Sequence, residues 1–168
     1  MLLDDAAFLG CIDDTKYAEE HGRFGVQTPA VKVLQTGTVR GRGLFAETNI
    51  PAGTIVTEVA GERVTVKKMG EKRREQDPRI FYSVKGVEKR RVFHVLGIMD
   101  PEDGLGMGTF ANDYRGAGGT GVNAEYVTGT DFKVYVKATR DLSMGEEILM
   151  DYGDKYWRVH PMMHNDGL

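Results

Sequence analysis

Short runs of β-branched and aromatic residues, separated by glycine-rich turns, make up most of the hydrophobic pattern of this chain. Such runs predict strands, because these residue types favour an extended backbone and alternate between the two faces of a sheet. The predicted strands cover residues 31–34, 54–59, 80–84, 92–98, 122–127 and 132–138. We therefore expect a mainly β fold of several small curled sheets.

Helical signals are few. Residues 4–20 have a loose helical pattern, and Asp13 or Asp14 is a candidate cap for its second half. Residues 63–76 are highly charged and have good helix formers in their second half, and Asp77-Pro78 ends this run. We expect residues 1–30 to form a short helical lead-in packed on the domain, with a partner-binding tail as the alternative.

The chain of 168 residues is long enough for one domain with its own core. Neither an internal repeat nor a low-complexity linker divides it, so we expect a single domain over residues 31–157 and a tail over residues 158–168. The 22 glycines follow no collagen-like period, which indicates many turns and loops that approach a ligand.

The charge balance limits the partners of the protein. A formal net charge of −3 argues against a chain that binds polyanions over its whole surface, so any basic surface must be local. The run from Lys67 to Arg74 is the candidate. Most such runs are solvated faces, and the alternative is a contact with nucleic acid or with an acidic protein.

Cysteine usage and the first residues bear on the compartment. Cys11 is the only cysteine, which excludes an intramolecular disulfide and fits a reducing compartment. Met1-Leu2-Leu3 runs directly into two aspartates, so we expect no signal peptide, and no apolar run is long enough to span a bilayer. The sequence thus predicts an intracellular protein.

Histidines give no metal signal. His94 lies inside an apolar predicted strand without a second ligand at metal spacing, so we expect a packed histidine there. His160 and His164 lie one helical turn apart but lack the cysteines of a zinc site. We therefore expect no metal.

Two glycine-bounded stretches are candidates for chemistry. Gly41 and Gly43 flank one residue, which lets a backbone turn tightly and present its amides to a ligand, although a structural hairpin explains the pair equally well. The stretch from Gly145 to Gly153 predicts a turn, a short buried strand and a second turn. Taken alone, its Tyr152 is typical of a tyrosine at the edge of a core.

Four stretches, taken together and in this order, resemble the SET domain, the fold of most protein-lysine methyltransferases. Residues 40–46 resemble its first motif, Gly-x-Gly followed by Leu-Phe-Ala, and residues 50–62 resemble the strand pair after it. Residues 100–112 resemble its asparagine-histidine region, with Phe110 and Asn112 in register, and residues 138–152 match its closing Arg-Asp-Ile to Asp-Tyr-Gly motif. The resemblance implies a pseudoknot-like fold, in which the closing segment threads under a loop of the asparagine region.

The resemblance also implies methyl transfer from S-adenosylmethionine to a neutral lysine amine, with S-adenosylhomocysteine as the product. Such a site must orient both reactants and exclude water. Tyr152 is implied as the catalytic tyrosine, through orientation and electrostatic support, because a free tyrosine titrates near about 10 and is a poor base. Tyr126 is implied as a second tyrosine of the site. The implied cofactor-binding residues are Arg40, Gly41, Arg42, Gly43, Leu44, Phe110, Asn112, Asp113, Tyr152 and Trp157.

The implied lysine channel consists of Val59, Tyr126, Met150 and Tyr152. Val59 stands where many members of the family have a tyrosine, and Met150 stands where many have Phe or Tyr. Methionine is flexible and has no hydroxyl, so mono-, di- and trimethylation all stay open. Trp157 is placed to stack on the adenine or to cap the channel, and a core anchor for the tail is the equal alternative.

Departures from the family pattern leave two other functions open. Asp113 replaces the family's histidine, and no cysteine-rich zinc-binding segment follows, so we expect Tyr156 and Trp157 to close the channel. The first expectation is a histone lysine methyltransferase in the nucleus, with a weak nucleosomal DNA contact through Lys67–Arg74. A methyltransferase of a non-histone protein, with the cytoplasm as an alternative location, is the second. A peptide-binding SET-like module without catalysis is the third.

Overall fold

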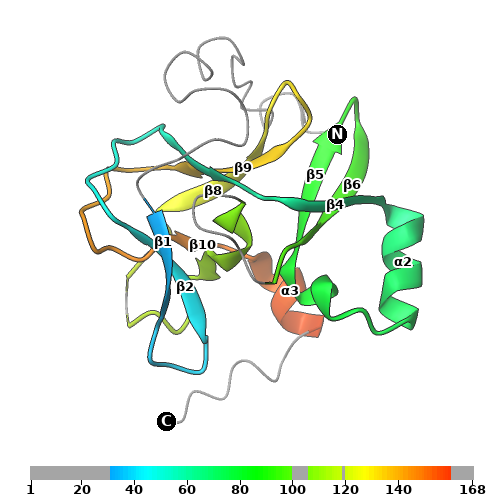
Figure 1. The fold of residues 1–168 in the computed structure, drawn as a ribbon, viewed down its shortest axis with the longest axis horizontal. Coiled ribbons are helices and arrows are strands. Elements are labelled where there is room, and N and C mark those ends of the chain that lie inside the picture. Colours follow the sequence, from blue (N-terminus) through cyan, green and yellow to red (C-terminus); the bar gives the residue numbers. More distant parts are fainter. Residues whose placement is uncertain (1–30, 100–105, 119, 160–168) are drawn as a thin grey trace.

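The computed structural model describes residues 31–99, 106–118 and 120–159. The helical lead-in expected over residues 1–30 and nearly all of the expected tail lie outside these residues. Within the described part, short strands form four small sheets and the helices are few, so the prediction of a mainly β fold is confirmed (Figure 1). None of the helices described is long and apolar enough to cross a membrane.

The first sheet is a hairpin of β1 (Val31–Gln35) and β2 (Arg42–Ala46), paired antiparallel. Thr36 holds its turn, because both its backbone N–H and its hydroxyl donate to the Gly41 carbonyl, at 2.8 and 2.7 Å. Gly41 has a φ of +70°, a conformation that side chains other than glycine adopt only with strain. The Gly-x-Gly pair therefore does shape a hairpin, and the same hairpin forms one wall of the pocket described below.

The second sheet has the order β3-β9-β8 and is antiparallel, with β3 at Ile55–Glu58, β9 at Val134–Ala138 and β8 at Ala124–Thr128. The central strand β9 is buried on both faces, since Val134, Val136 and Tyr135 are all at most 2 % exposed. Its inward face belongs to the main hydrophobic core of the domain.

Residues 61–97 form the third sheet together with a helix beside it (Figure 1). The strands are β4 (Gly61–Thr65), β5 (Ser83–Glu88) and β6 (Arg91–Gly97), in the order β4-β6-β5. Between β4 and β5 lie α2 (Val66–Arg74) and the 3-10 helix η2 (Pro78–Tyr82).

Helix α2 begins where its sequence supplies a cap. The Thr65 hydroxyl accepts the Lys68 N–H at 3.2 Å, which satisfies one of the free amides of the first turn. The only buried residue of the helix, Met69, packs with Val64 of β4 and Leu96 of β6. The other residues of the helix are mostly charged and are half-buried or exposed, so Met69 is its one buried anchor.

The fourth sheet joins distant parts of the chain. Strand β7 (Asn112–Asp113) pairs in parallel with β10 (Leu149–Met150), and η3 (Met107–Phe110) precedes β7. The segment that carries β10 also meets β2 on its other side, through an isolated bridge between Phe45 and Glu147. The closing segment therefore lies between the hairpin and the asparagine region, as the threaded arrangement requires.

Hydrogen bonds hold the loop over residues 114–123 against the segment that carries β10. The Tyr114 N–H donates to the Met150 carbonyl at 2.9 Å, and the Asn123 N–H donates to the Leu149 carbonyl at 3.0 Å. The Asn123 side chain is fully buried and spans the segment, because its Nδ2 donates to the Glu147 carbonyl at 2.8 Å and its Oδ1 accepts the Leu149 N–H at 2.7 Å. Both ends of the loop over residues 114–123 are thus tied to the strand that carries the closing motif.

Two local predictions differ from the structure. Residues 80–82 were expected to begin a strand but belong to η2, because Asp77 accepts the Arg79 N–H at 3.0 Å and Pro78 starts a helical turn. The strand begins only at Ser83. Residues 153–159 form α3, a short helix that the hydrophobic pattern did not predict. Both differences place aromatic side chains at the pocket.

Candidate active site

A cavity of about 670 Å³ lies between the β1–β2 hairpin, η2, η3 and α3. Its volume is in the range of cofactor pockets. The lining combines backbone and side chains from segments that are distant in sequence. These residues are Gln35, Val39, Arg40, Gly41, Arg42, Pro78, Phe81, Tyr82, Met99, Thr109, Phe110, Asn112, Asp113, Arg115, Tyr152, Tyr156 and Trp157.

Gly43 permits the closest approach in this region. A Cβ at this position would lie 2.5 Å from Glu147 Oε1, 2.9 Å from Thr36 Cγ2 and 3.0 Å from Asn112 Nδ2. Two of these three neighbours are held by other bonds, so they cannot simply move away. The second glycine of the first motif is therefore required by packing, whereas the first one, Gly41, is required by its backbone angle.

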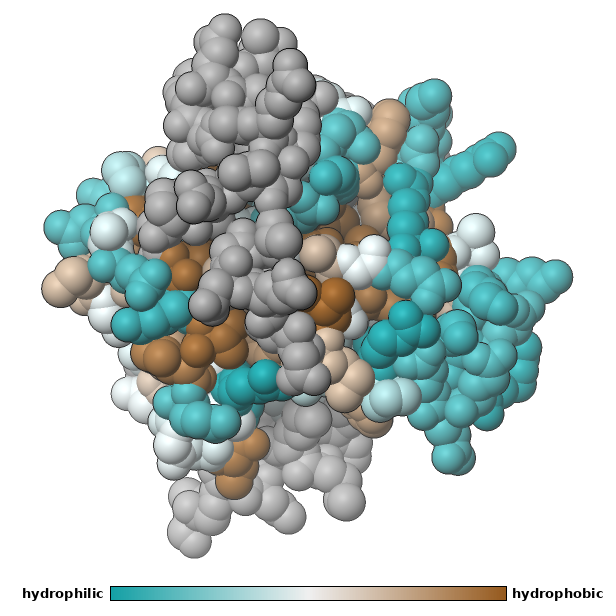
Figure 2. Space-filling view, viewed as in Figure 1, coloured by the Kyte–Doolittle hydropathy of each residue, from teal (hydrophilic) through white to brown (hydrophobic). Residues whose placement is uncertain are grey.

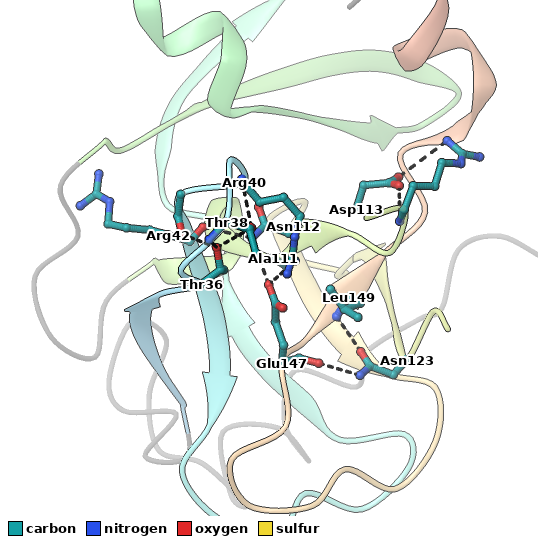
Figure 3. A network of polar contacts seen from close by, with 12 residues as sticks. Thr36, Thr38, Arg40, Arg42, Ala111, Asn112, Asp113, Asn123, Glu147 and Leu149 are labelled. Carbon is teal, nitrogen blue, oxygen red and sulfur yellow. Dashed lines mark hydrogen bonds and ion pairs between the residues drawn. The ribbon is translucent and has the colours of Figure 1, made fainter. Parts of the chain in front are cut away.

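We call Arg40, Asn112 and Glu147 (Figure 3), together with the adjoining Gly43, the pocket network. Arg40 Nη1 pairs with Glu147 Oε1 at 2.7 Å, and both side chains are mostly buried. Asn112 Nδ2 donates to the same carboxylate oxygen and to the Arg42 carbonyl, each at 3.1 Å. Since both neighbours of Nδ2 are acceptors, the amide can take only one orientation, and its Oδ1 stays available as an acceptor.

Arg42 crosses the back of the pocket. Its Nη2 donates to the Met99 carbonyl at 2.7 Å, and its guanidinium lies 4.8 Å from the centre of the Phe110 ring. Phe110 in turn stands 5.8 Å from Tyr82, between ring centres. The residue between the two glycines therefore links the hairpin to the aromatic side of the pocket.

Tyr152 is held at two points. Its hydroxyl donates to the Ala111 carbonyl at 2.7 Å, and its backbone N–H donates to Asp113 Oδ2 at 2.6 Å. Burial raises the pKa of Tyr152 well above its usual value, and the nearby hydroxyls of Tyr126 and Tyr156 act in the same direction. The tyrosine is thus neutral across the accessible pH range and is a fixed hydrogen-bonding group.

Tyr126 has a parallel arrangement. Its hydroxyl donates to the Gly108 carbonyl at 3.1 Å, and burial followed by the nearby Tyr156 hydroxyl raises the pKa of Tyr126. Burial likewise raises the pKa of Tyr156, with Asp113 as the second cause. Burial thus raises the pKa of all three tyrosines, and two of their hydroxyls donate to backbone carbonyls.

Aromatic rings from α3 pack on the catalytic tyrosine implied by the resemblance. Tyr156 meets Tyr152 edge to face with ring centres 4.8 Å apart, and Trp157 stacks at 6.5 Å from Tyr152. Arg115 lies over the Trp157 ring at 6.0 Å and binds Asp154 and Asp151 at 3.1 and 3.2 Å. These contacts hold α3 against the pocket.

Asp113 is buried and acts as a bracket beneath Tyr152. Besides accepting the Tyr152 N–H, its carboxylate accepts the Arg115 N–H at 2.9 Å and lies 3.8 Å from the Arg115 guanidinium. Where the family has a histidine, this chain therefore has an acidic side chain that ties the asparagine region to the closing motif.

The structure brings together most of the residues that the sequence proposes for the cofactor. Eight of them line the cavity: Arg40, Gly41, Arg42, Phe110, Asn112, Asp113, Tyr152 and Trp157. Gly43 lies directly behind it against Glu147 and Asn112. Leu44 is fully buried in the main core and contributes its carbonyl to the Ile148 N–H at 2.8 Å.

The residues proposed for the lysine channel divide in the same way. Tyr152 lines the cavity, whereas Val59 and Met150 are almost fully buried in the main core. Tyr126 packs against that core and points its hydroxyl to the Gly108 carbonyl. Gly108 lies close to Val59, since a Cβ on Gly108 would lie 2.7 Å from Val59 Cγ2.

Sequence reasoning assigned no site role to eight of the pocket residues, among them Phe81, Tyr82, Met99 and Arg115, or to Glu147 behind them. Phe81 and Tyr82 lie on the helical turn that was expected as a strand, and Met99 and Arg115 carry no motif signal. Glu147 belongs to the closing motif, but only the structure shows that its carboxylate joins Arg40 to Asn112. The available sequence signal for Glu147 was its place in the acidic pair Glu146-Glu147, directly before the apolar run over residues 148–150.

The donor set suits S-adenosylmethionine. Asn112 Oδ1 is an oriented acceptor for an α-ammonium group, and Arg40 Nε is buried without a hydrogen-bond acceptor among the described residues, which suits a carboxylate. The rings of Phe81, Tyr82 and Trp157 offer apolar faces for an adenine. Polar groups at one end and aromatic groups at the other match a methionine joined to a nucleoside.

Comparisons with known proteins identify the family and the fold. The sequence model of one family, the SET domain, matches residues 41–153. Among solved structures, CpSET8 from Cryptosporidium aligns with a TM-score of 0.56 and 19 % identity, over 74 % of this chain and 57 % of that chain. The chain thus spans little more than half the length of that protein. A search of curated protein sequences finds no match.

Proposed function

Because the chain belongs to the SET-domain family, whose methyltransferases use S-adenosylmethionine to methylate protein lysines, we propose that it transfers a methyl group from this cofactor to the ε-amino group of a protein lysine. The observation that carries the proposal is the placement of Tyr152. Its hydroxyl is bonded to a backbone carbonyl at the wall of a pocket whose donors and acceptors suit the cofactor.

Within this proposal the cofactor supplies an electrophilic methyl group on sulfur. Asn112 and Arg40 would hold the methionine part, and the rings of Tyr82 and Trp157 would flank the nucleoside. The lysine nitrogen would lose a proton to solvent, and its lone pair would then form the new carbon–nitrogen bond. The sulfur–methyl bond would break in the same step, so that its electron pair stays on sulfur and S-adenosylhomocysteine leaves. A weakly hydrated site favours the uncharged amine.

Tyr152 orients this amine. Its O–H is used by the Ala111 carbonyl, so the hydroxyl lone pairs are left to accept an N–H of the lysine. Because the pKa of Tyr152 is raised, the group is not a base at neutral pH. Tyr126 supports the same place through its hydroxyl, while Val59 and Met150 limit its size from behind.

Histones are the first substrate class to test, and a nuclear location follows from that class. A methyltransferase of a non-histone protein, in the nucleus or the cytoplasm, is the alternative, since the chain is acidic overall. One further alternative is favoured by a specific feature: Asp113 stands in place of the family's histidine and bonds the Tyr152 backbone at 2.6 Å. A module that binds peptide without turnover would tolerate this change more easily than an enzyme.

The test is transfer of labelled methyl from S-adenosylmethionine to core histones, nucleosomes and a panel of non-histone extracts. Tyr152→Phe should reduce turnover by roughly a hundredfold or more, because the orienting hydroxyl is lost. Tyr135→Phe is the matched control: it removes a tyrosine hydroxyl that donates to Asp131 at 2.7 Å, outside the pocket. It should leave turnover unchanged.

Equal turnover by Tyr152→Phe and wild type would remove Tyr152 from catalysis. Cofactor binding without label on any substrate would instead support the non-catalytic module. Label only on extracts would move the proposal from histones to another protein.

A further inference from the structure

Charge is distributed unevenly between two parts of this chain. Residues 61–97, which we call the basic module, hold eleven of the 22 Lys and Arg residues but only five of the 25 Asp and Glu residues. Their formal charge is therefore +6, in a chain of −3 overall. Figure 2 shows hydrophilic side chains gathered over α2 and the end of the β5–β6 hairpin. An acidic protein with one strongly basic unit presents a local electrostatic target.

Most of these cations are not neutralised. Ion pairs with acidic residues use four of the eleven, among them Arg63 with Glu88 and Arg79 with Asp77. The other seven have no acidic partner among the described residues: Lys67, Arg73, Arg74, Lys85, Lys89, Arg90 and Arg91. All seven are exposed. The surplus charge is thus available to a partner.

Cations from different elements face one place. His94 of β6 lies opposite Lys85 of β5 in the strand register. Arg73 of α2 also acts on it, because burial, then Arg73 and then Lys85 lower the pKa of His94. The helix and the hairpin therefore both place cations near His94.

The tip of the β5–β6 hairpin has two cations at positions whose backbone angles favour other residue types. Lys89 and Arg90, the two turn residues between β5 and β6, both have positive φ, at 45° and 67°. Two-residue turns of this kind favour Asn-Gly, because other side chains are strained there. Two cations occupy these positions instead. A residue that occupies a strained backbone position, although its type suits that position poorly, points to a function for its side chain.

From this surface we infer that the basic module binds the phosphate backbone of double-stranded DNA. Rows of exposed Lys and Arg without acidic partners are suited to phosphates and need no base contacts. Protein interfaces and single-stranded nucleic acids both rely on exposed aromatic residues. The described residues of α2 and of the β5–β6 hairpin include none, since Phe93 is buried, and the exposed Phe81 of η2 lies at the cavity instead. The inference does not depend on methyl transfer.

Fluorescence anisotropy with a random-sequence duplex of about 30 base pairs, without cofactor, tests the inference over 50 to 200 mM salt. Wild type should bind with an affinity that falls steeply with salt, at a logarithmic slope between about −3 and −6. Lys89→Asn with Arg90→Gly should make this slope shallower by about two and weaken binding roughly tenfold at 0.1 M salt. Because Asn-Gly suits the turn, the melting temperature should stay the same or rise.

A matched control removes two cations elsewhere. Lys32 and Lys137 lie outside the basic module and pair with Glu47 and Glu125. Lys32→Gln with Lys137→Gln should leave DNA affinity and its slope as in wild type. Methyl transfer to a free peptide should not change in the Lys89→Asn, Arg90→Gly variant, so failure of this inference and failure of the proposed function give different results.

Three outcomes would overturn the inference: no salt-dependent binding by wild type, equal affinity of the hairpin variant and wild type, or an equal loss in the control. Tighter binding to an acidic polypeptide such as polyglutamate, with the same dependence on Lys89 and Arg90, would assign the surface to a protein instead. Tighter binding to duplex RNA than to duplex DNA would assign it to RNA.

Discussion

The pocket network joins residues that are far apart in the sequence, whereas the basic module is assembled from neighbours. Arg40 and Glu147 are 107 residues apart, and Asn112 and Arg42 are 70 apart. In the basic module the two longest side-chain bonds between its strands and loops, Arg63 to Glu88 and Arg79 to Glu62, span only 25 and 17 residues. The first region is buried and the second is exposed.

This difference determines how each region responds to change. A group in the pocket network is bonded on several sides, so its loss leaves partly buried partners without their hydrogen bonds. A cation of the basic module loses little when it is removed, because its neighbours remain solvated. Substitutions in the pocket network should therefore change stability and cofactor binding. Substitutions in the basic module should change long-range electrostatic interactions.

The largest effect is expected where the closing segment is held in its loop. Asn123→Ala would leave the Leu149 N–H and the Glu147 carbonyl without partners, since Asn123 bonds both at 2.7 and 2.8 Å. We expect the free energy of unfolding to fall by about 3 kcal/mol. Chemical denaturation measures it. A loss below about 0.5 kcal/mol, the usual size for a surface site, would contradict the comparison.

Two glycine substitutions should have opposite signs. Gly43→Ala places a Cβ 2.5 Å from the Glu147 carboxylate and should cost about 1–3 kcal/mol of stability. Gly70→Ala, inside α2, meets only Arg74 Nη1 at 3.9 Å and should gain about 0.5–1 kcal/mol. Thermal or chemical unfolding of the two variants side by side measures both. The same sign for both would mean that the two regions are not packed as described.

The hairpin tip sharpens the comparison further. Replacing Lys89 and Arg90 by Asn and Gly relieves the backbone strain that their positive φ angles cause. The free energy of unfolding should rise by up to about 1 kcal/mol. The same variant loses DNA affinity, so stability and binding should change in opposite directions. A drop in melting temperature would show that these side chains are structural.

The smallest effect concerns pH. Hydrogen bonds from Arg140, Ser143 and Asn123 lower the pKa of Glu146. A carboxyl with a lowered pKa in the folded state stabilises the fold at neutral pH, and this contribution is lost as pH falls through that pKa. Glu146→Gln should therefore lose stability at pH 7 and show a weaker fall between about pH 5 and 3. A pH series of denaturation curves measures this, and parallel curves for both proteins would contradict it.

Sequence reasoning recovered the parts of this fold that local patterns determine. The alternation in residues 31–34 and 132–138 predicted β1 and β9, and the motif around Gly41 and Gly43 predicted a tight hairpin. It failed where a cap overrides hydrophobicity: the Asp77 side chain and Pro78 turn an apolar run into η2. It also missed α3, whose seven residues are too few for a helical period to be recognised.

The candidate site was recoverable only through resemblance. Asn112 and Tyr152 have no local pattern that marks them, and the structure adds the reason for the neighbouring Gly43, which is the space taken by Glu147 and Asn112. Glu147 and Arg115 could not be found from the sequence, because their partners lie 35 to 107 residues away. A sequence pattern does not show which residues, far apart in the chain, come into contact in the fold.

The most direct test of the account is calorimetric binding of S-adenosylmethionine to wild type and to Asn112→Ala. The account predicts one site per chain in wild type and an affinity lower by roughly ten- to a hundredfold in the variant, because a hydrogen bond to a charged group is lost. Asn49→Ala, which removes an asparagine that accepts the Met144 N–H at 2.9 Å far from the cavity, should bind as wild type. Equal affinity of Asn112→Ala and wild type would contradict the claim that the pocket network holds the cofactor.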